Sequence, residues 1–257
     1  MQAEYRFEQD DIVGAAKELV LAATAIDGSP SGPYAVAIAP FIESCASGLE
    51  AVLDGYRGLV GQPDALAARL HFVAVEEACG AGILTEMAGY APPELHAAVL
   101  AHAEDEKRHM RMLLNSARRL AVSFPVAETV VVDGKEELAG AEGAFDSFFV
   151  SVHLSEIRGA MSFVALRSLI GQGRHPGERY ASQVLEAIIK DELDHVAYTG
   201  RAVRKAAHTN AITTAEISSY GTHVDRFWKN DAAHLAECLV SPAKVIMHER
   251  FGSPSRN

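Results

Sequence analysis

The sequence predicts an all-α protein. Apolar residues recur at steps of three and four positions through almost every segment, and clusters of Gly, Pro and Ser interrupt this pattern. Only VAETVVVDG, at 126–134, has the composition of extended chain. The expected helices cover 7–26, 34–60, 64–89, 94–121, 138–171, 178–208 and 213–239.

Turn signals mark the ends of these helices. They are DGSPSGP at 27–33, GQP at 61–63, APP at 91–93 and GQGRHPG at 171–177. A capping box, from Thr213 to Glu216, predicts the start of the last helix. No composition shift or flexible linker divides the chain, so we expect residues 1–257 to form a single domain.

Composition restricts the class of function. A net charge of −11 argues against a broad nucleic-acid or anionic-membrane surface, because both need a positive field. Three cysteines without a C-x-x-C pair indicate neither a disulfide framework nor a thiolate metal site, which fits a reducing, cytoplasmic setting. The N-terminus is acidic where a signal peptide would be basic, and the longest apolar runs, such as LVLAATAI, are too short to span a bilayer. We therefore expect neither a signal peptide nor a membrane span.

Two segments share the pattern D-E-x-x-H. The first holds Asp105, Glu106 and His109, and the second holds Asp191, Glu192 and His195. Residues three apart on a helix project from one face, so each pair of Glu and His can offer an oxygen and a nitrogen to one metal ion. One such pair is more often a solvated helix face than a ligand set, but a second copy favours a metal site.

The expected helix before each D-E-x-x-H helix carries one more candidate glutamate. Glu77 and Glu156 both open the pattern E-x-x-G-A. The midpoint of positions 77 and 106 falls within Ala91–Pro93, and that of 156 and 192 falls within GQGRHPG, as expected for antiparallel helix pairs. Glu76 satisfies the first midpoint nearly as well, and only the E-x-x-G-A pattern favours Glu77.

These residues resemble the ferritin-like diiron-carboxylate superfamily, which carries E, E-x-x-H, E and E-x-x-H on four bundled helices. The resemblance covers about residues 64–208. It implies a four-helix core in which a long crossover connects the second helix to the third. Residues 1–61 and 212–257 would then form additional helices that flank this core. It implies two iron ions as cofactors, held by Glu77, Glu106, His109, Glu156, Glu192 and His195. It also implies that Glu106 and Glu192 bridge the ions as the catalytic pair, with Asp105 and Asp191 supporting the histidines.

Carboxylate and imidazole ligands without thiolate suit Fe or Mn, and a dimanganese or mixed site stays open. The resemblance implies O₂ as a co-substrate. The group Phe145, Phe148, Phe149, Val152 and Phe163 beside Glu156 can line an apolar cavity, although ordinary core packing explains each member by itself. We therefore expect a diiron oxygenase or oxidase acting on a small, largely apolar organic substrate, with an external electron donor.

Two alternatives stay open. One is a ferritin-like protein that oxidises or stores iron, or removes peroxide, without an organic substrate. The other is a metal-free structural module. The flanking helices either cover the bundle or form the face of a homodimer. His153 is a further ligand, a proton donor, or a satisfied core or rim histidine. Tyr198 either relays electrons or protons or packs in the core.

Overall fold

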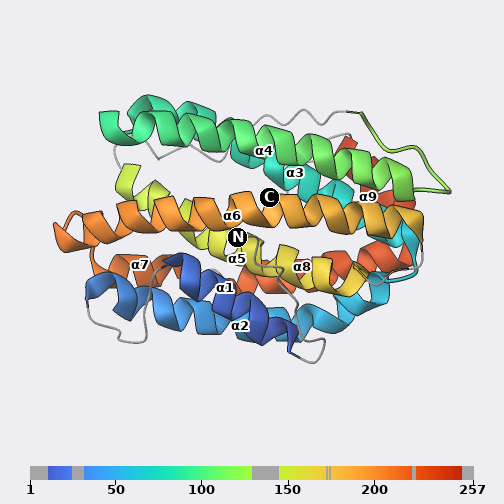
Figure 1. Ribbon diagram of the computed structural model, residues 1–257, viewed down its shortest axis with the longest axis horizontal. Helices are drawn as coiled ribbons and strands as arrows, with labels where there is room; N and C mark the ends of the chain where they lie inside the picture. Colours follow the sequence, from blue (N-terminus) through green and yellow to red (C-terminus); the bar gives the residue numbers. More distant parts are fainter. Residues whose placement is uncertain are drawn as a thin grey trace, which may run out of the picture. The chain divides into compact units, whose positions relative to one another are not determined.

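Helices make up most of the chain in the computed structural model, which describes residues 11–24, 32–128, 145–171, 173, 175–221 and 224–250 (Figure 1). No strand occurs in these ranges, so the all-α prediction is confirmed. The helices are α1 (Ile12–Thr24), α2 (Pro33–Leu59), α3 (Pro63–Met87), the 3-10 helix η1 (Ala88–Tyr90), α4 (Pro93–Leu120), α5 (Phe145–Ile170), α6 (Pro176–His208), α7 (Thr214–Gly221), α8 (Val224–Val240) and α9 (Pro242–Arg250).

The expected helix boundaries hold to within a few residues wherever the structure describes them. The expected helix at 213–239 corresponds to α7 and α8, and residues 222–223 between them lie outside the described ranges. The sequence did not indicate α9, because this helix begins only one residue after α8 ends. Residues 121–128 lie outside any helix, as the extended composition from 126 onward suggested. The expected helical residues 7–10, 25–26 and 138–144, and residues 129–134 of the extended stretch, lie outside the described ranges.

Proline begins five of these helices. It occupies the first position of α2, α3, α4, α6 and α9. The first amide of a helix has no intrahelical acceptor, so proline loses no hydrogen bond there, and its fixed φ suits the helix. The capping box at α7 is present as expected, because the Thr213 hydroxyl accepts the Glu216 amide and Glu216 Oε2 accepts the Thr213 amide at 2.7 Å.

The chain divides into two compact units, each of several segments. The first contains 1–56, 146–172 and 185–231, and the second contains 57–145, 173–184 and 232–257. The contact between Glu77 and His109 lies within the second unit, and the contact between Glu156 and His195 lies within the first. The single-domain organisation stays a prediction.

In the second unit, α3 and α4 pack against each other as an antiparallel pair. Asp64 at the start of α3 contacts Val122 just after α4, and Glu77 later on α3 contacts His109 earlier on α4. The residue numbers of the two partners thus change in opposite directions, which defines an antiparallel pair. This register places Glu77 beside the E-x-x-H segment, as the turn at Ala91–Pro93 predicted from the sequence.

In the first unit, α5 runs antiparallel to the part of α6 that begins at Leu185. Contacts join His153 to Thr199, Glu156 to His195 and Arg167 to Glu186. The α5 position rises as the α6 position falls, which defines the antiparallel direction. The second E-x-x-H segment therefore lies beside the helix that carries Glu156.

Two helices, α2 and α5, are long and apolar enough to cross a membrane on length and composition alone. Buried core helices of soluble proteins meet the same criterion. The α5 helix also carries Glu156, Arg158 and the buried His153, polar residues that a lipid-facing helix disfavours. The absence of a membrane partner stays a prediction.

Asp64 joins the start of α3 to the chain that leaves α4. Its Oδ1 accepts the amides of Val122, at 2.6 Å, and Ser123, at 3.2 Å. We expect Asp64→Ala to lower the free energy of unfolding by about 1 kcal/mol, because the amides of Val122 and Ser123 lose a charged acceptor and the first turn of α3 loses a negative charge. Asp64→Asn keeps one acceptor oxygen and should lose less. Urea unfolding followed by circular dichroism measures both, and equal stability of all three proteins would contradict this role.

Candidate metal centre

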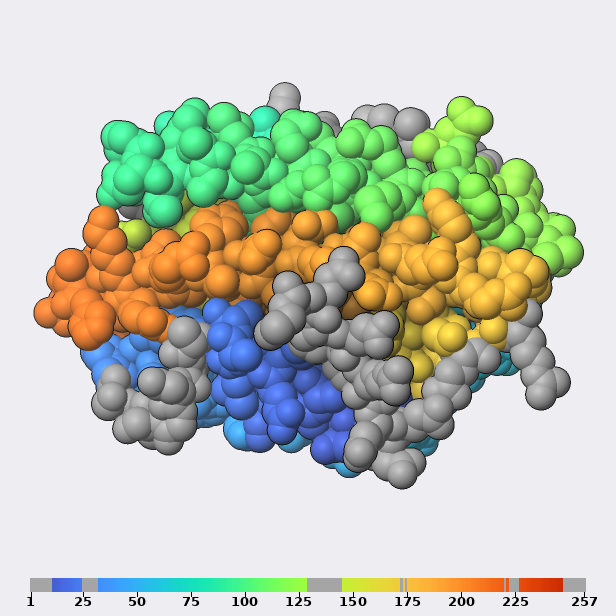
Figure 2. Space-filling model, in the orientation of Figure 1, coloured from blue at the N-terminus to red at the C-terminus, as the bar shows by residue number. Residues whose placement is uncertain are grey.

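The inner face of α4 carries the first group of candidate ligands. Glu106 and His109 are buried, whereas Glu104 and Arg108 are exposed on the outer face of the same helix, which is green in Figure 2. A helix places residues three apart on one side, so E-x-x-H sends both ligands inward while the intervening charges face water. The spacing in the sequence thus directs two metal-binding side chains into the protein.

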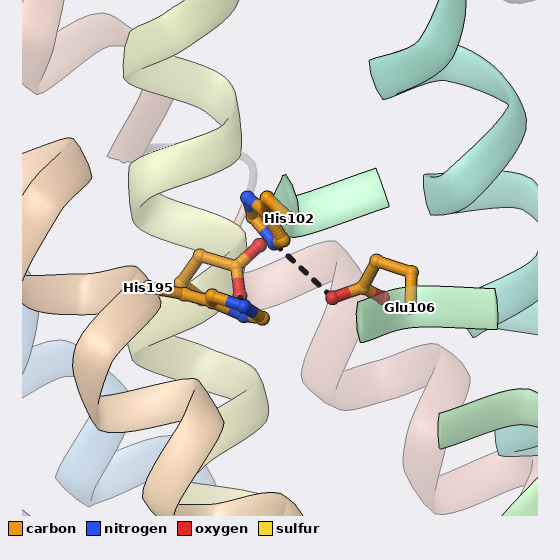
Figure 3. A group of neighbouring side chains, drawn as sticks. His102, Glu106 and His195 are labelled. Carbon is orange, nitrogen blue, oxygen red and sulfur yellow. Dashed lines mark hydrogen bonds and ion pairs between the residues drawn. The ribbon is translucent and has the colours of Figure 1, made fainter. Parts of the chain in front are cut away.

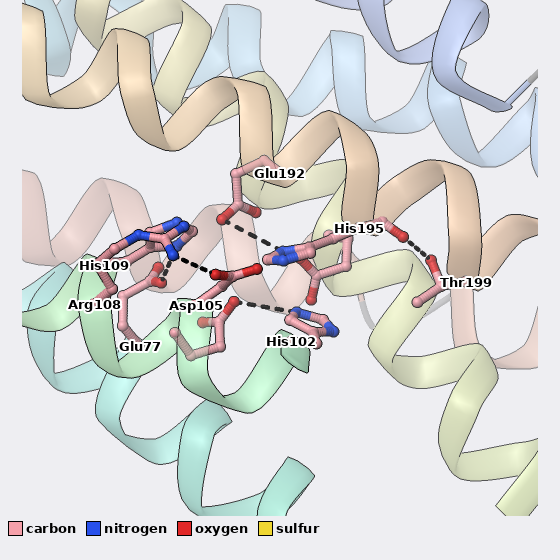
Figure 4. Close-up of polar contacts among 10 residues, drawn as sticks. Glu77, His102, Asp105, Arg108, His109, Glu192, His195 and Thr199 are labelled. Carbon is pink, nitrogen blue, oxygen red and sulfur yellow. Dashed lines mark hydrogen bonds and ion pairs between the residues drawn. The ribbon is translucent and has the colours of Figure 1, made fainter. Parts of the chain in front are cut away.

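Glu77 on α3 completes this group, which we call the α3–α4 cluster together with Glu106, His109 and His102. Glu77 Oε2 lies 3.2 Å from His109 Nδ1 (Figure 4). Each of Glu77, Glu106 and His109 offers a ligand atom within 4.8 Å of the other two. These buried groups can hold a metal ion. Glu77 makes this contact, the position that the E-x-x-G-A pattern favoured over Glu76.

His102 is a member of the cluster that sequence reasoning missed. Its Nε2 lies 3.1 Å from Glu106 Oε1, and its side chain is buried (Figure 3). His102 precedes Glu106 by four residues, so the signal was H-x-x-x-E-x-x-H rather than E-x-x-H. The hydrogen bond orients one oxygen of a predicted bridging carboxylate.

The second group, the α5–α6 cluster, consists of Glu156, Glu192 and His195. His195 Nδ1 lies 3.5 Å from Glu156 Oε2 and 3.9 Å from Glu192 Oε1. Glu192 and His195 are buried, and Glu156 is half-buried. Figure 4 shows the Glu192 and His195 side chains extending from α6. This cluster too offers carboxylate oxygens and an imidazole nitrogen.

The two clusters share one internal design. In each, the single glutamate approaches Nδ1 of the E-x-x-H histidine, and a glycine three residues later lies beside the E-x-x-H glutamate. A Cβ added at Gly80 would lie 3.4 Å from Glu106 Oε2, and one at Gly159 would lie 3.7 Å from Glu192 Oε2. Both glycines of the repeated E-x-x-G-A pattern therefore lie next to a carboxylate of the E-x-x-H pair.

Burial makes these carboxylates costly. Glu77, Glu106 and Glu192 retain only 8%, 7% and 3% of their surface exposed. A carboxylate taken from water into a protein interior is destabilising unless opposite charge or hydrogen bonds compensate it. A bound divalent cation supplies that compensation. The donor set, oxygen and nitrogen without thiolate, suits iron or manganese chemically.

Asp105 and Asp191 are the residues that the resemblance implies as hydrogen-bond partners of the ligating histidines. Asp105 is half-buried and forms an ion pair with Arg108 one turn later on α4. Asp191 is also half-buried. The proposed contacts of these two aspartates with the ligating histidines stay predictions.

His153 lies one turn before Glu156, and both of its ring nitrogens are hydrogen-bonded. Nε2 lies 2.8 Å from the Tyr34 hydroxyl, and Nδ1 lies 2.8 Å from Thr199 Oγ1. Burial lowers the pKa of His153 to about 3, against an opposing effect of the Glu156 charge. Burial also raises the pKa of Tyr34, which the charge of Arg204 partly offsets. His153 is therefore a neutral, satisfied core histidine.

The aromatic side chains of α5 divide into two groups. Phe149 and Phe163 are buried in the core, whereas Phe145 and Phe148 are half-buried. Phe149 meets the ring of Tyr198 edge-on at 5.8 Å between centroids, and Tyr198 lies 6.4 Å from the His195 ring. Tyr198 thus packs between the aromatic core and a candidate ligand.

Comparisons with protein-family models, with curated proteins and with solved structures give no match for this chain. The ferritin-like resemblance therefore rests on the motifs and on the geometry of the two clusters.

Because Glu106 is buried, we expect the substitution Glu106→Gln to affect thermal stability differently in metal-free and in metal-bound protein. In metal-free protein, Glu106→Gln should leave the melting temperature unchanged or raise it, because it removes a buried negative charge and keeps an acceptor for His102. Binding of Mn²⁺ at about 100 times its Kd should stabilise the unmodified protein by about 2.7 kcal/mol. The variant should gain much less.

Scanning calorimetry in chelator and in Mn²⁺ measures this difference. Glu104→Gln is the matched control, because Glu104 is exposed on the outer face of the same helix. It should respond to Mn²⁺ as the unmodified protein does. An equal Mn²⁺ response in all three proteins would show that Glu106 takes no part in metal binding.

Proposed function

We propose that this protein is an O₂-activating dimetal oxidoreductase that oxidises a small, largely apolar organic molecule. The observation that carries the proposal is the shared design of the two buried clusters, each with one glutamate beside an E-x-x-H pair. Two such clusters on consecutive antiparallel helix pairs match the ligand pattern of ferritin-like carboxylate proteins.

In this proposal, α3, α4, α5 and α6 form a four-helix bundle, and the two clusters together hold two metal ions. Glu77 with His109, and Glu156 with His195, would each hold one ion. Glu106 and Glu192 would bridge the pair as the catalytic carboxylates. We assign iron as the metal, with manganese or a mixed pair as the alternatives that the same donors accept.

A pair of redox-active ions supplies the two electrons that dioxygen activation needs. The protein supplies the surroundings. Its buried helix faces exclude water, which strengthens the interactions of charged groups at the site. His102 fixes one oxygen of Glu106 by its hydrogen bond. Gly80 and Gly159 carry no side chain beside Glu106 and Glu192.

The proposed substrate class rests on the apolar residues of the helix that carries Glu156. Phe149 and Phe163 lie seven residues before and after Glu156 on α5, and their apolar side chains favour a substrate without charge. An external donor would return the electrons. The net charge of −11 supports a soluble, cytoplasmic protein without nucleic-acid or membrane partners, with the flanking helices available for a homodimer.

Anaerobic titration with Fe²⁺ tests the metal centre. We expect about two iron ions per chain and a visible absorption band that develops only after O₂ is admitted. Glu106→Gln combined with Glu192→Gln should abolish tight binding, whereas Glu104→Gln should not. Absence of iron binding by the unmodified protein would end the proposal and favour a metal-free structural module.

The iron-handling alternative uses the same ligands and needs a separate measurement. A ferritin-like store keeps oxidising Fe²⁺ beyond two ions per chain and elutes as a large assembly in size-exclusion chromatography. An oxygenase stops at its bound pair and consumes further O₂ only with an electron donor and a substrate. Continued iron oxidation by a large assembly would replace the organic-substrate proposal.

A further inference from the structure

Three buried side chains from three helices form one hydrogen-bonded chain beside the α5–α6 cluster. They are Tyr34 of α2, His153 of α5 and Thr199 of α6, and each is at most 2% exposed. The chain continues from Thr199 Oγ1 to the backbone carbonyl of His195 at 2.6 Å, a contact that Figure 4 shows. His153 lies three residues before Glu156, and Thr199 lies four residues after His195.

The hydrogen bonds determine where the protons of the Tyr34 hydroxyl, the His153 ring and the Thr199 hydroxyl lie. The carbonyl of His195 can only accept, so Thr199 donates its single hydroxyl proton there. The Thr199 oxygen must then accept from His153, which places the imidazole proton on Nδ1. His153 Nε2 is therefore unprotonated and accepts the hydroxyl proton of Tyr34 at 2.8 Å.

The packing is built around this contact. A Cβ at Gly200 would lie only 2.8 Å from the Tyr34 oxygen and 3.1 Å from His153 Cε1, so glycine is needed for the two rings to meet. The guanidinium of Arg204 covers the Tyr34 ring at 4.9 Å from its centroid and donates to the carbonyl of Thr24. Tyr34 is thus held in one orientation, away from solvent.

We propose that Tyr34 is a one-electron redox residue whose phenol proton moves to Nε2 of His153 when an electron leaves the ring. The products are a neutral tyrosyl radical and a His153 imidazolium, and the electron passes to the oxidant. Returning the electron to the ring and the proton to the phenol oxygen restores the starting state. The natural oxidant would be the oxidised metal centre, so this inference rests on the proposed function for its physiological role.

The hydrogen bond between the two rings and the acidity of the oxidised phenol favour this transfer. A phenol becomes strongly acidic when it loses an electron, so even a weakly basic imidazole accepts its proton at hydrogen-bond distance. Burial, the largest effect, and the charge of Arg204 lower the pKa of His153, whereas the negative charge of Glu156 raises it and thus stabilises the imidazolium. Burial of Tyr34 shields the radical from solutes. His153 lies one helical turn from Glu156, and its hydrogen-bond partner Thr199 lies one turn from His195, so the pair is close to the candidate ligands.

The test uses metal-free full-length protein and a ruthenium(III) polypyridyl complex generated by a laser flash as the oxidant. Electron paramagnetic resonance should detect a tyrosyl radical that persists longer than the radical of free tyrosine. Tyr34→Phe should remove at least four-fifths of this long-lived signal. Tyr56→Phe, which alters another buried tyrosine of α2, should retain it.

Two further variants separate the role of the pair from the integrity of the fold. Gly200→Ala keeps both rings but forces them apart, and it should shorten the lifetime of the radical at least tenfold. Gly82→Ala, which meets no atom within 4 Å, is the matched control and should have no effect. His153→Gln should slow Tyr34 oxidation and abolish the solvent deuterium isotope effect that the unmodified pair shows. Circular dichroism checks that each variant is folded.

A long-lived radical of equal size in Tyr34→Phe, or none in the unmodified protein, would overturn the inference. So would a lifetime unaffected by Gly200→Ala. Because the oxidant is external, these outcomes do not depend on iron binding. Failure of the iron titration with a positive flash experiment would remove the proposed function and leave the redox pair intact.

Discussion

Buried negative charge is the constraint on which the candidate site depends. Glu77, Glu106 and Glu192 lie in the interior of helices whose other inward residues are mostly apolar. Their burial opposes folding unless cations or hydrogen-bond donors meet them. Histidines provide part of this compensation, since His109 and His102 approach the carboxylates of the α3–α4 cluster at 3.2 and 3.1 Å. A metal ion provides the larger share in the proposed function.

The local design of the two helix pairs could be predicted from the sequence because it depends on short-range periodicity. The E-x-x-H spacing fixes which side of α4 and α6 carries the ligands, and the turn at Ala91–Pro93 fixes which α3 residue reaches His109. These relations involve one helix or one turn at a time. The resulting contacts between Glu77 and His109, and between Glu156 and His195, are those that the sequence indicated.

Contacts between residues far apart in the sequence could not be predicted in the same way. Tyr34 and His153 are 119 positions apart, and no periodicity links α2 to α5. His102 was missed for a different reason, because a histidine four residues before a glutamate is common on solvated helix faces. Only its burial distinguishes it from such a residue. The start of α9 at Pro242 was missed because it follows α8 after a single residue.

The differences between the two clusters bear on function as much as their similarities do. His102 contacts Glu106, whereas the corresponding position four residues before Glu192 is the apolar, buried Ile188. Conversely, the hydrogen-bonded chain of Tyr34, His153 and Thr199 adjoins the α5–α6 cluster. In the proposed function, these differences would place the two ions in different surroundings, and metal ions in different surroundings differ in potential. The hydrogen-bonded residues would then lie beside the ion held by the α5–α6 cluster.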